Sequence, residues 1–283
     1  MSGRRPSRRV PSLRANRRQG RRQGRRRLRL RLPGRRLLRR RLRQARWWLL
    51  DYLYAWIGQT RAFLSRARPA DFRSGDKAPI VIIPGVYESW QFMRPLIQTL
   101  HDHGHPVHVV AALGRNRRSL TDAAATVAAY LERENLTDVI IVAHSKGGLI
   151  GKQLMTTDDP QHRVTAMTAI SAPFAGSRYA LYWVVPSIRA FAPANVALHD
   201  LGLNHRVNDR IVSIYGVFDP HIPEGSELVG ARNIRLHVGG HFRILGDPAT
   251  VRAVLDTVTD AAAPVTRITG PGTVRRVPDS RSR

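Results

Sequence analysis

Short apolar runs alternate along the chain with longer segments whose apolar residues recur at helical spacing. Continuous runs bounded by turn residues are typical of strands that are buried on both faces. These runs predict strands at 80–83, 107–111, 139–143, 164–171, 211–215 and 234–238, with helices near 90–103, 119–134, 147–156 and 248–261. Because strands that alternate with helices form parallel sheets through right-handed crossovers, we expect an α/β fold with a doubly wound, mostly parallel sheet of about six strands.

One long segment interrupts this alternation. Residues 173–209 are rich in aromatic residues and proline and lie between the fourth and fifth expected strands. An insertion at this point lies above the carboxyl ends of the strands, where open α/β sheets place their ligands. We therefore expect residues 173–209 to form a cap over a binding site.

A second segment outside the alternation precedes the first strand. Residues 47–68 carry apolar side chains mostly at helical spacing, among them Trp47, Leu50, Tyr54 and Ile57. This pattern predicts an amphipathic helix. Two placements remain open: the apolar stripe docks on the domain that follows, or the helix rests on a membrane surface beside the basic segment that precedes it.

The formal net charge of +27 is concentrated at the beginning of the chain, because residues 1–46 hold 21 of the 47 basic residues and no acidic residue. Such a segment repels itself and has too little apolar surface to fold, so we expect residues 1–46 to be disordered. The polar residues 263–283 are expected to form a flexible end. The remaining 26 basic and 20 acidic residues leave about +6, an ordinary balance for a soluble domain.

The absence of cysteine excludes disulfides, thiolate chemistry and cysteine-ligated metals. The first apolar run, 47–58, is interrupted by Asp51, is too short to span a bilayer and lacks a clean cleavage site for a signal peptide. We therefore expect a cytoplasmic protein. Three interpretations of residues 1–46 remain open: peripheral contact with an anionic membrane, contact with another polyanion, or a translated extension upstream of the true start.

The strongest chemical signal is Ser145, which lies between the expected strand at 139–143 and the helix that follows it. A serine at the apex of a tight strand–turn–helix has an exposed hydroxyl and a strained backbone, and its neighbours two residues away must be small. Ala143 and Gly147 meet this requirement. The backbone amide of Lys146, at the start of the helix, would point toward the hydroxyl and stabilise an oxyanion.

The segment AHSKGG around Ser145 resembles the GHSxGG nucleophile elbow of α/β-hydrolase lipases and esterases, with Ala143 in place of the usual glycine. The resemblance extends over 78–260 and implies an α/β-hydrolase catalytic domain at 78–262. Pro84, Gly85 and Val86 are similar to the HG segment of this family, with proline in place of histidine. The resemblance implies that the Val86 amide contributes to the oxyanion hole and that Gly85 permits close approach of the substrate.

The same resemblance supplies an acid and a base. Asp219 follows the fifth expected strand in the segment GVFDP, which resembles the acid turn of the family, and His241 follows the last strand, where the family places its base. The order Ser145, Asp219, His241 is the chain order of the triad in this fold. His144 is implied to support the nucleophile.

Other residues compete less well for these roles. Asp209, Glu224 and Glu227 are alternative acids, but their places in the chain fit the family pattern less closely than that of Asp219. His221 would lie near the acid, and we assign it no proton transfer. No metal ion or cofactor is expected.

These features predict a serine hydrolase that cleaves carboxylic esters. The segment SAPFAGS at 171–177 is similar to the SPxxGS segment of lipases that act on acyl lipids, and the apolar residues of 179–191 are suited to cover an acyl pocket or to pack the cap on the core. Two alternatives remain open: the same triad used for acyl transfer or amide cleavage, and a polyanion- or membrane-binding protein that works through its arginine-rich segment, without specific reading of nucleic-acid sequence.

Overall fold

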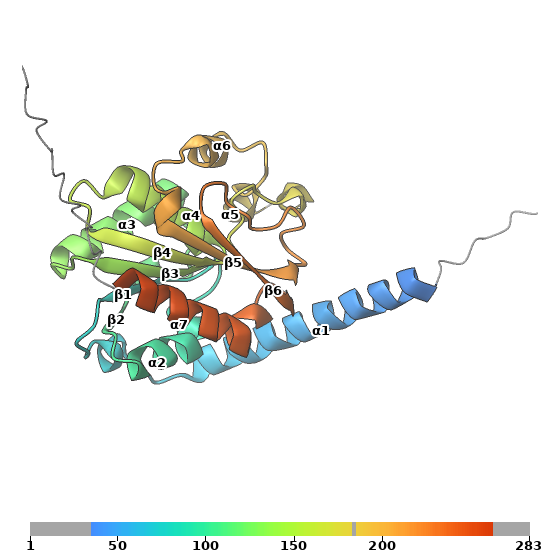
Figure 1. The fold of residues 1–283 in the computed structure, drawn as a ribbon, viewed down its shortest axis with the longest axis horizontal. Helices are drawn as coiled ribbons and strands as arrows, with labels where there is room; N and C mark the ends of the chain where they lie inside the picture. Colours follow the sequence, from blue (N-terminus) through green and yellow to red (C-terminus); the bar gives the residue numbers. More distant parts are fainter. Residues whose placement is uncertain (1–34, 183–184, 263–283) are drawn as a thin grey trace, which may run out of the picture.

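The structure, a computed structural model, describes residues 35–182 and 185–262 (Figure 1). The expectations for 1–34 and 263–283 fall outside the described residues. Among the residues that are described, no helix combines the length and the hydropathy needed to cross a bilayer.

Six parallel strands form one sheet in the order β2-β1-β3-β4-β5-β6 (Figure 1). They are β1 (Ile80–Ile83), β2 (Val107–Val109), β3 (Val139–His144), β4 (Val164–Ile170), β5 (Ile211–Phe218) and β6 (Arg232–Gly239). The α/β fold with a doubly wound parallel sheet is therefore confirmed. The order of the strands reverses between β1 and β3, and in open α/β sheets the crevice at such a reversal holds the ligand.

Two layers of helices cover the two faces of the sheet (Figure 1). Helices α3 (Leu120–Arg133) and α4 (Lys146–Gln153) pack on one face, with Val81 and Ile83 of β1 in the same core. Helices α2 (Arg94–Asp102) and α7 (Pro248–Ala262) pack on the other, with Ile80 and Ile82. Successive residues of β1 thus point to opposite cores, which is why its sequence is continuously apolar.

Short helices complete the structure. The segment expected to form a cap contains η5 (Arg178–Tyr182), α5 (Pro186–Arg189), α6 (Val196–Leu203) and η6 (Asn208–Arg210). The other short helices are η1 (Pro69–Phe72), η2 (Trp90–Met93), η3 (Ala111–Leu113), η4 (Leu154–Asp158) and η7 (Arg243–Gly246).

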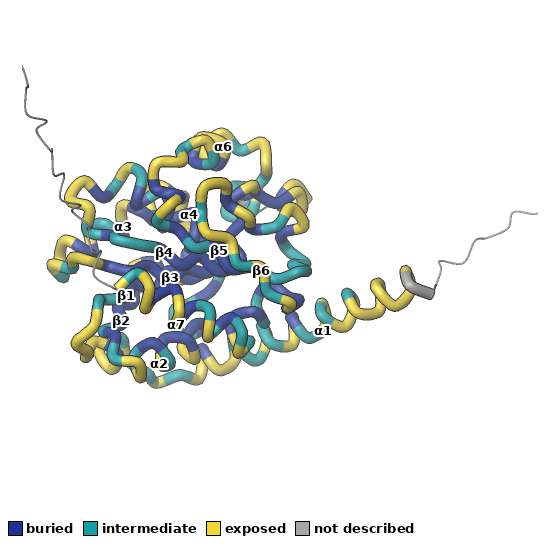
Figure 2. Tube along the Cα trace, in the orientation of Figure 1, coloured by how far each residue is buried: buried dark blue, intermediate teal, exposed yellow. Residues whose placement is uncertain are grey.

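The first helix, α1 (Arg35–Leu64), begins well before the predicted start at residue 47. The expectation of disorder up to residue 46 is therefore wrong for 35–46. That expectation weighed the repulsion among arginines, whereas arginine, leucine, glutamine and alanine all have high intrinsic helix propensity. The beginning of α1 projects beyond the sheet, and much of its surface is exposed (Figure 2).

The rest of α1 packs closely on the domain. A Cβ atom at Gly239 would lie 2.2 Å from the ring of Trp47, and one at Gly58 would lie 2.6 Å from the ring of Phe92. Glycine at these two positions lets the helix and the body of the domain approach each other. Trp47 also stacks on Phe218 of β5, with 5.9 Å between ring centroids. One face of α1 is thus part of the folded domain.

Candidate active site

Ser145 lies in a sharp turn between β3 and α4, at the strand reversal. Its φ of +51° is in the left-handed region, which is strained for a residue with a side chain. A Cβ atom at Gly147 would lie 2.1 Å from the carbonyl oxygen of Ile83, so only glycine lets α4 start this close to β1. The turn therefore holds the serine at the carboxyl edge of the sheet.

The structure brings Ser145, His241 and Asp219 into one chain of hydrogen bonds. The Ser145 hydroxyl lies 3.0 Å from His241 Nε2, and His241 Nδ1 donates to Asp219 Oδ2 at 2.8 Å. The other carboxylate oxygen, Oδ1, accepts from the amides of His221 (2.7 Å) and Ile222 (3.0 Å). Three side chains distant in sequence are thus aligned for proton transfer at Ser145.

The charges of the buried pair stabilise each other. Burial by itself would raise the pKa of Asp219, but the charge of His241 and the hydrogen bonds to His241 and the His221 amide hold that pKa below its usual value. Burial would lower the pKa of His241, but the charge and hydrogen bond of Asp219 raise it above its usual value. The environment of His241 therefore favours the imidazolium that forms when the ring takes a proton.

His221 lies beside this pair and differs from it. Its pKa is lowered to about 4, first by burial and then by the charge of His241. The two rings are 5.0 Å apart between centroids, and the Nε2 atom of His221 has no hydrogen-bond partner among the described residues. His221 is therefore neutral at pH 7, and it donates a hydrogen bond to Asp219 through its backbone amide.

The two amides expected to form an oxyanion hole come from the ends of neighbouring strands. Val86 follows β1 and lines the same pocket as Ser145, and Lys146 is the first residue of α4. The Lys146 ammonium donates to the carbonyl oxygens of Asn116 (3.0 Å) and Arg118, and burial lowers its pKa to about 8. Because Asn116 also donates to the Pro84 carbonyl (2.6 Å), it joins the loop after β1 to the start of α4.

A second histidine–carboxylate pair, Glu88 and His144, lies behind the first. Glu88 is buried, 2.9 Å from His144 Nδ1, and it accepts from the Gly85 amide at 2.8 Å. The other nitrogen of the ring, Nε2, donates to the backbone carbonyl of His241 at 3.0 Å. The pair therefore connects the loop of Gly85 to the loop of His241. His144 was expected to have a supporting place, whereas sequence reasoning missed Glu88.

The alternative acids lie elsewhere. Glu224 pairs with Arg178 at 2.7 Å, and both Asp209 and Glu227 are exposed. None of the three has a hydrogen bond to His241 within the described ranges.

Comparison with solved structures decides the fold. The mature form of a lipase from Bacillus licheniformis superposes with a TM-score of 0.53 at 17% sequence identity, covering 68% of this chain and 99% of that one. The propeptide form of that lipase gives a TM-score of 0.54 at 16% identity, covering 68% of this chain and 54% of that one. A Mycobacterium tuberculosis protein named as a candidate non-heme bromoperoxidase gives 0.51 at 15% identity, covering 67% and 94%.

The chain has the α/β-hydrolase fold. Its sequence matches no protein-family model and no curated protein sequence. At these low identities the structural likeness establishes the fold only. The reaction must therefore be inferred from the residues of the site.

A largely apolar pocket of about 280 Å³ opens beside Ser145 in this domain. Ile188 and Phe191 of the cap segment line it together with Val86 and Phe242. Tyr52 and Gln59 of α1 also line it, a contribution that the sequence did not predict. The described residues contain no group of three histidine or acidic side chains placed to hold a metal ion.

Helix α1 also supports the loop that carries His241. Asp51 is fully buried, and its Oδ1 accepts from the amides of Phe242 and Arg243, both at 2.8 Å. A Cβ atom at Gly240 would lie 2.6 Å from this oxygen. The Asp51 carboxylate, which interrupts the first apolar run of the sequence, therefore caps η7, directly after His241.

Proposed function

We propose that this protein is a serine hydrolase that cleaves carboxylic esters with apolar acyl groups. The observation that carries the proposal is the continuous hydrogen-bonded chain from Asp219 through His241 to Ser145, with 2.8 Å and 3.0 Å between the bonded atoms. A serine hydroxyl becomes a competent nucleophile when an adjacent base can accept its proton and a third group orients that base.

In the first half of the reaction, Ser145 Oγ attacks the acyl carbonyl carbon while His241 Nε2 takes the hydroxyl proton. Asp219 stabilises the resulting imidazolium, and the amides of Val86 and Lys146 bind the carbonyl oxygen as it becomes an oxyanion. When the bond from carbon to the alcohol oxygen breaks, the imidazolium returns its proton to the leaving alcohol. The product of this half is an acyl ester on Ser145.

In the second half, water replaces the alcohol. His241 takes a proton from the water molecule as its oxygen attacks the acyl carbon, and Ser145 recovers a proton when the acyl bond breaks. The carboxylic acid then leaves. This sequence uses one base twice and needs no group beyond the residues named.

The lining of the pocket supports an apolar acyl group. Its walls are formed mainly by valine, isoleucine, alanine, phenylalanine and tyrosine side chains, and its volume of about 280 Å³ is just below the usual range for small-molecule sites. We therefore expect short or medium acyl chains to fit inside the pocket, with longer chains continuing over its rim.

Labelling with a fluorophosphonate tests the proposal. We expect the full chain to be labelled at Ser145 and to hydrolyse a chromogenic short-chain ester, with both signals lost in Ser145→Ala. Ser187→Ala is the matched control, since its hydroxyl lies near the pocket, 3.0 Å from the Tyr87 hydroxyl, but outside the chain of hydrogen bonds. Equal labelling of Ser145→Ala and the control would refute the assignment, whereas ester cleavage that proceeds only with an added alcohol as acceptor would favour acyl transfer.

A further inference from the structure

Helix α1 has two apolar faces, and only one of them is covered by the domain. Trp47, Asp51 and Gly58 lie on the covered face. On the opposite face, Leu49 is 67% exposed, Trp56 69% and Phe63 85%. Leu38, Leu42 and Leu53 are also exposed and fall on the same side at helical spacing. We call the stripe formed by Leu38, Leu42, Leu49, Leu53, Trp56 and Phe63 the outer stripe.

The charges around the outer stripe are almost all of one sign. The sequence of α1 contains arginine at 35, 36, 39, 40, 41, 43, 46 and 61, and its one acidic residue, Asp51, is buried on the covered face. A long helix with leucine and aromatic residues on one side and arginines beside them is typical of helices that lie in the interface of a bilayer. The positive charge of α1 favours a bilayer that contains anionic lipids over an uncharged apolar surface.

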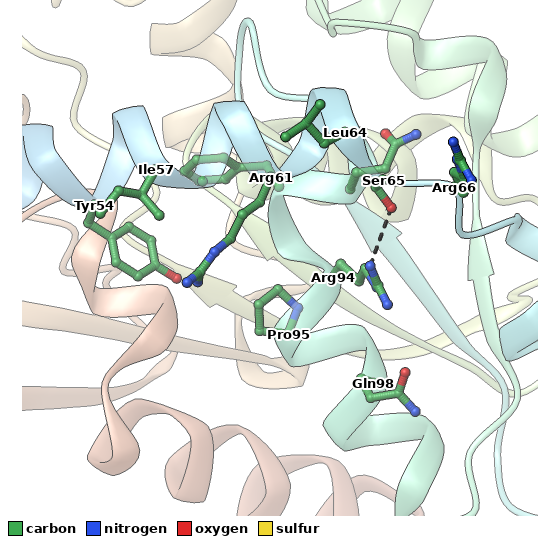
Figure 3. Close-up of a pocket in the computed structure, with 12 residues that line it drawn as sticks. Tyr54, Ile57, Arg61, Leu64, Ser65, Arg66, Arg94, Pro95 and Gln98 are labelled. Carbon is green, nitrogen blue, oxygen red and sulfur yellow. Dashed lines mark hydrogen bonds between the residues drawn. The ribbon is translucent and has the colours of Figure 1, made fainter.

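A separate cleft adds positive charge at the end of α1. This cavity of about 720 Å³ lies between α1 and α2, away from Ser145, with apolar walls that include Ile57 and Phe92. Figure 3 shows Arg61, Arg66 and Arg94 bordering it, with Arg94 donating to Ser65 Oγ at 3.4 Å. The combination of apolar walls and three arginines suits the phosphate and the glycerol backbone of a phospholipid.

The pocket beside Ser145 opens next to this helix. Tyr52 of α1 lines the pocket and is 5.6 Å from the ring of His221, yet it is also exposed. Tyr179 of the cap also lines the pocket, and Tyr182, also in η5, is exposed. A surface that covered the outer stripe would therefore lie close to the mouth of the pocket.

We propose that α1 docks this protein on the surface of a bilayer that contains anionic phospholipids, with the outer stripe in the interface and the arginines at the headgroups. The docked helix holds the mouth of the pocket toward the lipid. The docking goes beyond the proposed function and does not depend on it, since binding of the helix to a bilayer requires no catalysis.

Sedimentation with vesicles tests the docking, using the full chain with Ser145→Ala so that binding is measured without turnover. We expect binding to vesicles of phosphatidylcholine with about 30% phosphatidylglycerol, and at least tenfold weaker binding to phosphatidylcholine alone. Salt at about 0.5 M should remove most of this preference, because it screens the attraction between the arginines and the headgroups.

A variant of the outer stripe separates its contribution from that of residues 1–34, which all proteins in the test retain. We expect Leu49→Ser, Trp56→Ser and Phe63→Ser combined to weaken binding to the anionic vesicles by about tenfold for each side chain. The matched control combines Val196→Ser, Leu203→Ser and Val229→Ser, which are comparably exposed and lie outside α1. The control should bind like the parent protein.

A second variant addresses the cleft. Arg61→Gln with Arg66→Gln should reduce the preference for anionic vesicles by about fivefold for each arginine, whereas Arg117→Gln with Arg206→Gln, both exposed elsewhere, should leave it unchanged. Circular dichroism and thermal melting of every variant check that the fold is retained.

Two outcomes would overturn the docking. One is equal vesicle binding by the stripe variant and its control. The other is a parent protein that does not bind vesicles but elutes as an oligomer, while the stripe variant elutes as a monomer, because the outer stripe would then join copies of this chain.

With the serine restored, cleavage of a soluble short-chain ester should be the same in the stripe variant and its control, while cleavage of a vesicle-embedded ester should fall only in the stripe variant. Loss of ester cleavage in every protein alongside normal vesicle binding would reject the proposed function and leave the docking intact.

Discussion

Two buried histidine–carboxylate pairs lie side by side in this domain, with 5.0 Å between the ring centroids of His144 and His241. In each pair a carboxylate lies 2.8–2.9 Å from Nδ1. The difference is at the other nitrogen, which meets the Ser145 hydroxyl in one pair and the His241 backbone carbonyl in the other. A hydroxyl can give up a proton to the ring, whereas a carbonyl oxygen has no proton to give.

The third partner therefore sets what each pair can do. His241 can take a proton from Ser145 and return it. His144 has acceptor oxygens at both nitrogens, so its ring holds the loop of His241 to Glu88 and, through Glu88, to Gly85. The same chemical pair is arranged for proton transfer in one place and for positioning in the other.

Replacing each histidine in turn should reveal the largest difference between the two pairs. We expect His241→Gln to lower kcat/KM by about 10⁴-fold or more, because Ser145 loses its base. His144→Gln should lower it far less and should instead reduce the thermal stability of the protein. Ester hydrolysis and thermal melting of both variants test this, and similar activity losses in the two would contradict it.

Replacing each carboxylate with an amide should give a smaller difference in activity than replacing the histidines. Asp219→Asn should lose more activity, whereas Glu88→Gln should lose more stability. Asp219→Asn should cost about 10³- to 10⁴-fold in kcat, since the imidazolium loses its partner and the tautomer is no longer held. Glu88→Gln should mainly destabilise the fold, by about 3 kcal/mol, because its charge is buried against His144 and the Gly85 amide. Denaturant unfolding alongside kinetics separates the two effects.

The pH profile should distinguish the pairs again. Burial lowers the pKa of His241, but Asp219 raises it by more, so the pKa lies above its usual value of 6.5. We therefore expect kcat/KM to fall about tenfold per pH unit below that raised pKa. Asp219→Asn should move the inflection to lower pH, and Glu88→Gln should move it less because its charge acts from farther away. An inflection unmoved in Asp219→Asn would show that another group is titrating.

The same shifts predict how stability depends on pH. The raised pKa of His241 adds stability that is fully present below pH 6.5 and is lost as the pH rises through the pKa in the folded state. The lowered pKa of Asp219 adds stability that is present above pH 3.8 and is lost as the pH falls. The contribution of this pair is therefore constant and greatest between these two values, and Asp219→Asn should flatten the pH dependence of the free energy of unfolding above pH 6.5 and below pH 3.8.

The smallest effect on activity is expected from Asp51, which supports the His241 loop from α1. Asp51→Ala removes two charge-assisted hydrogen bonds and should cost about 2–3 kcal/mol of stability, with a several-fold loss of kcat. Asp51→Asn keeps an acceptor oxygen and should recover most of both. No recovery by asparagine would point to the negative charge itself.

The local pattern of apolar residues predicted the positions of the strands correctly. All six strands begin within two residues of the predicted position, because a strand buried on both faces leaves a continuous apolar run. The start of α1 was wrong because charge repulsion and helix propensity oppose each other there, and local sequence does not weigh one against the other.

Three residues that support the site were missed for a different reason. Glu88 meets His144 across 56 residues of sequence, Asp51 meets Phe242 across 191, and the side chain of Asn116 reaches Pro84 across 32. Each is a single polar residue with no motif around it, so nothing in its neighbourhood marks it as buried.

The sequence by itself determined the strands, the tight turn around Ser145 and the order of the three candidate triad residues, since each depends on short-range periodicity or on small residues beside a turn. Only the tertiary structure decided that Glu88 pairs with His144, that α1 lines the pocket, and that the described residues leave one apolar face of α1 uncovered. These features depend on which surfaces meet when the sheet is covered by its helices, and burial and hydrogen-bond geometry exist only once those surfaces have met.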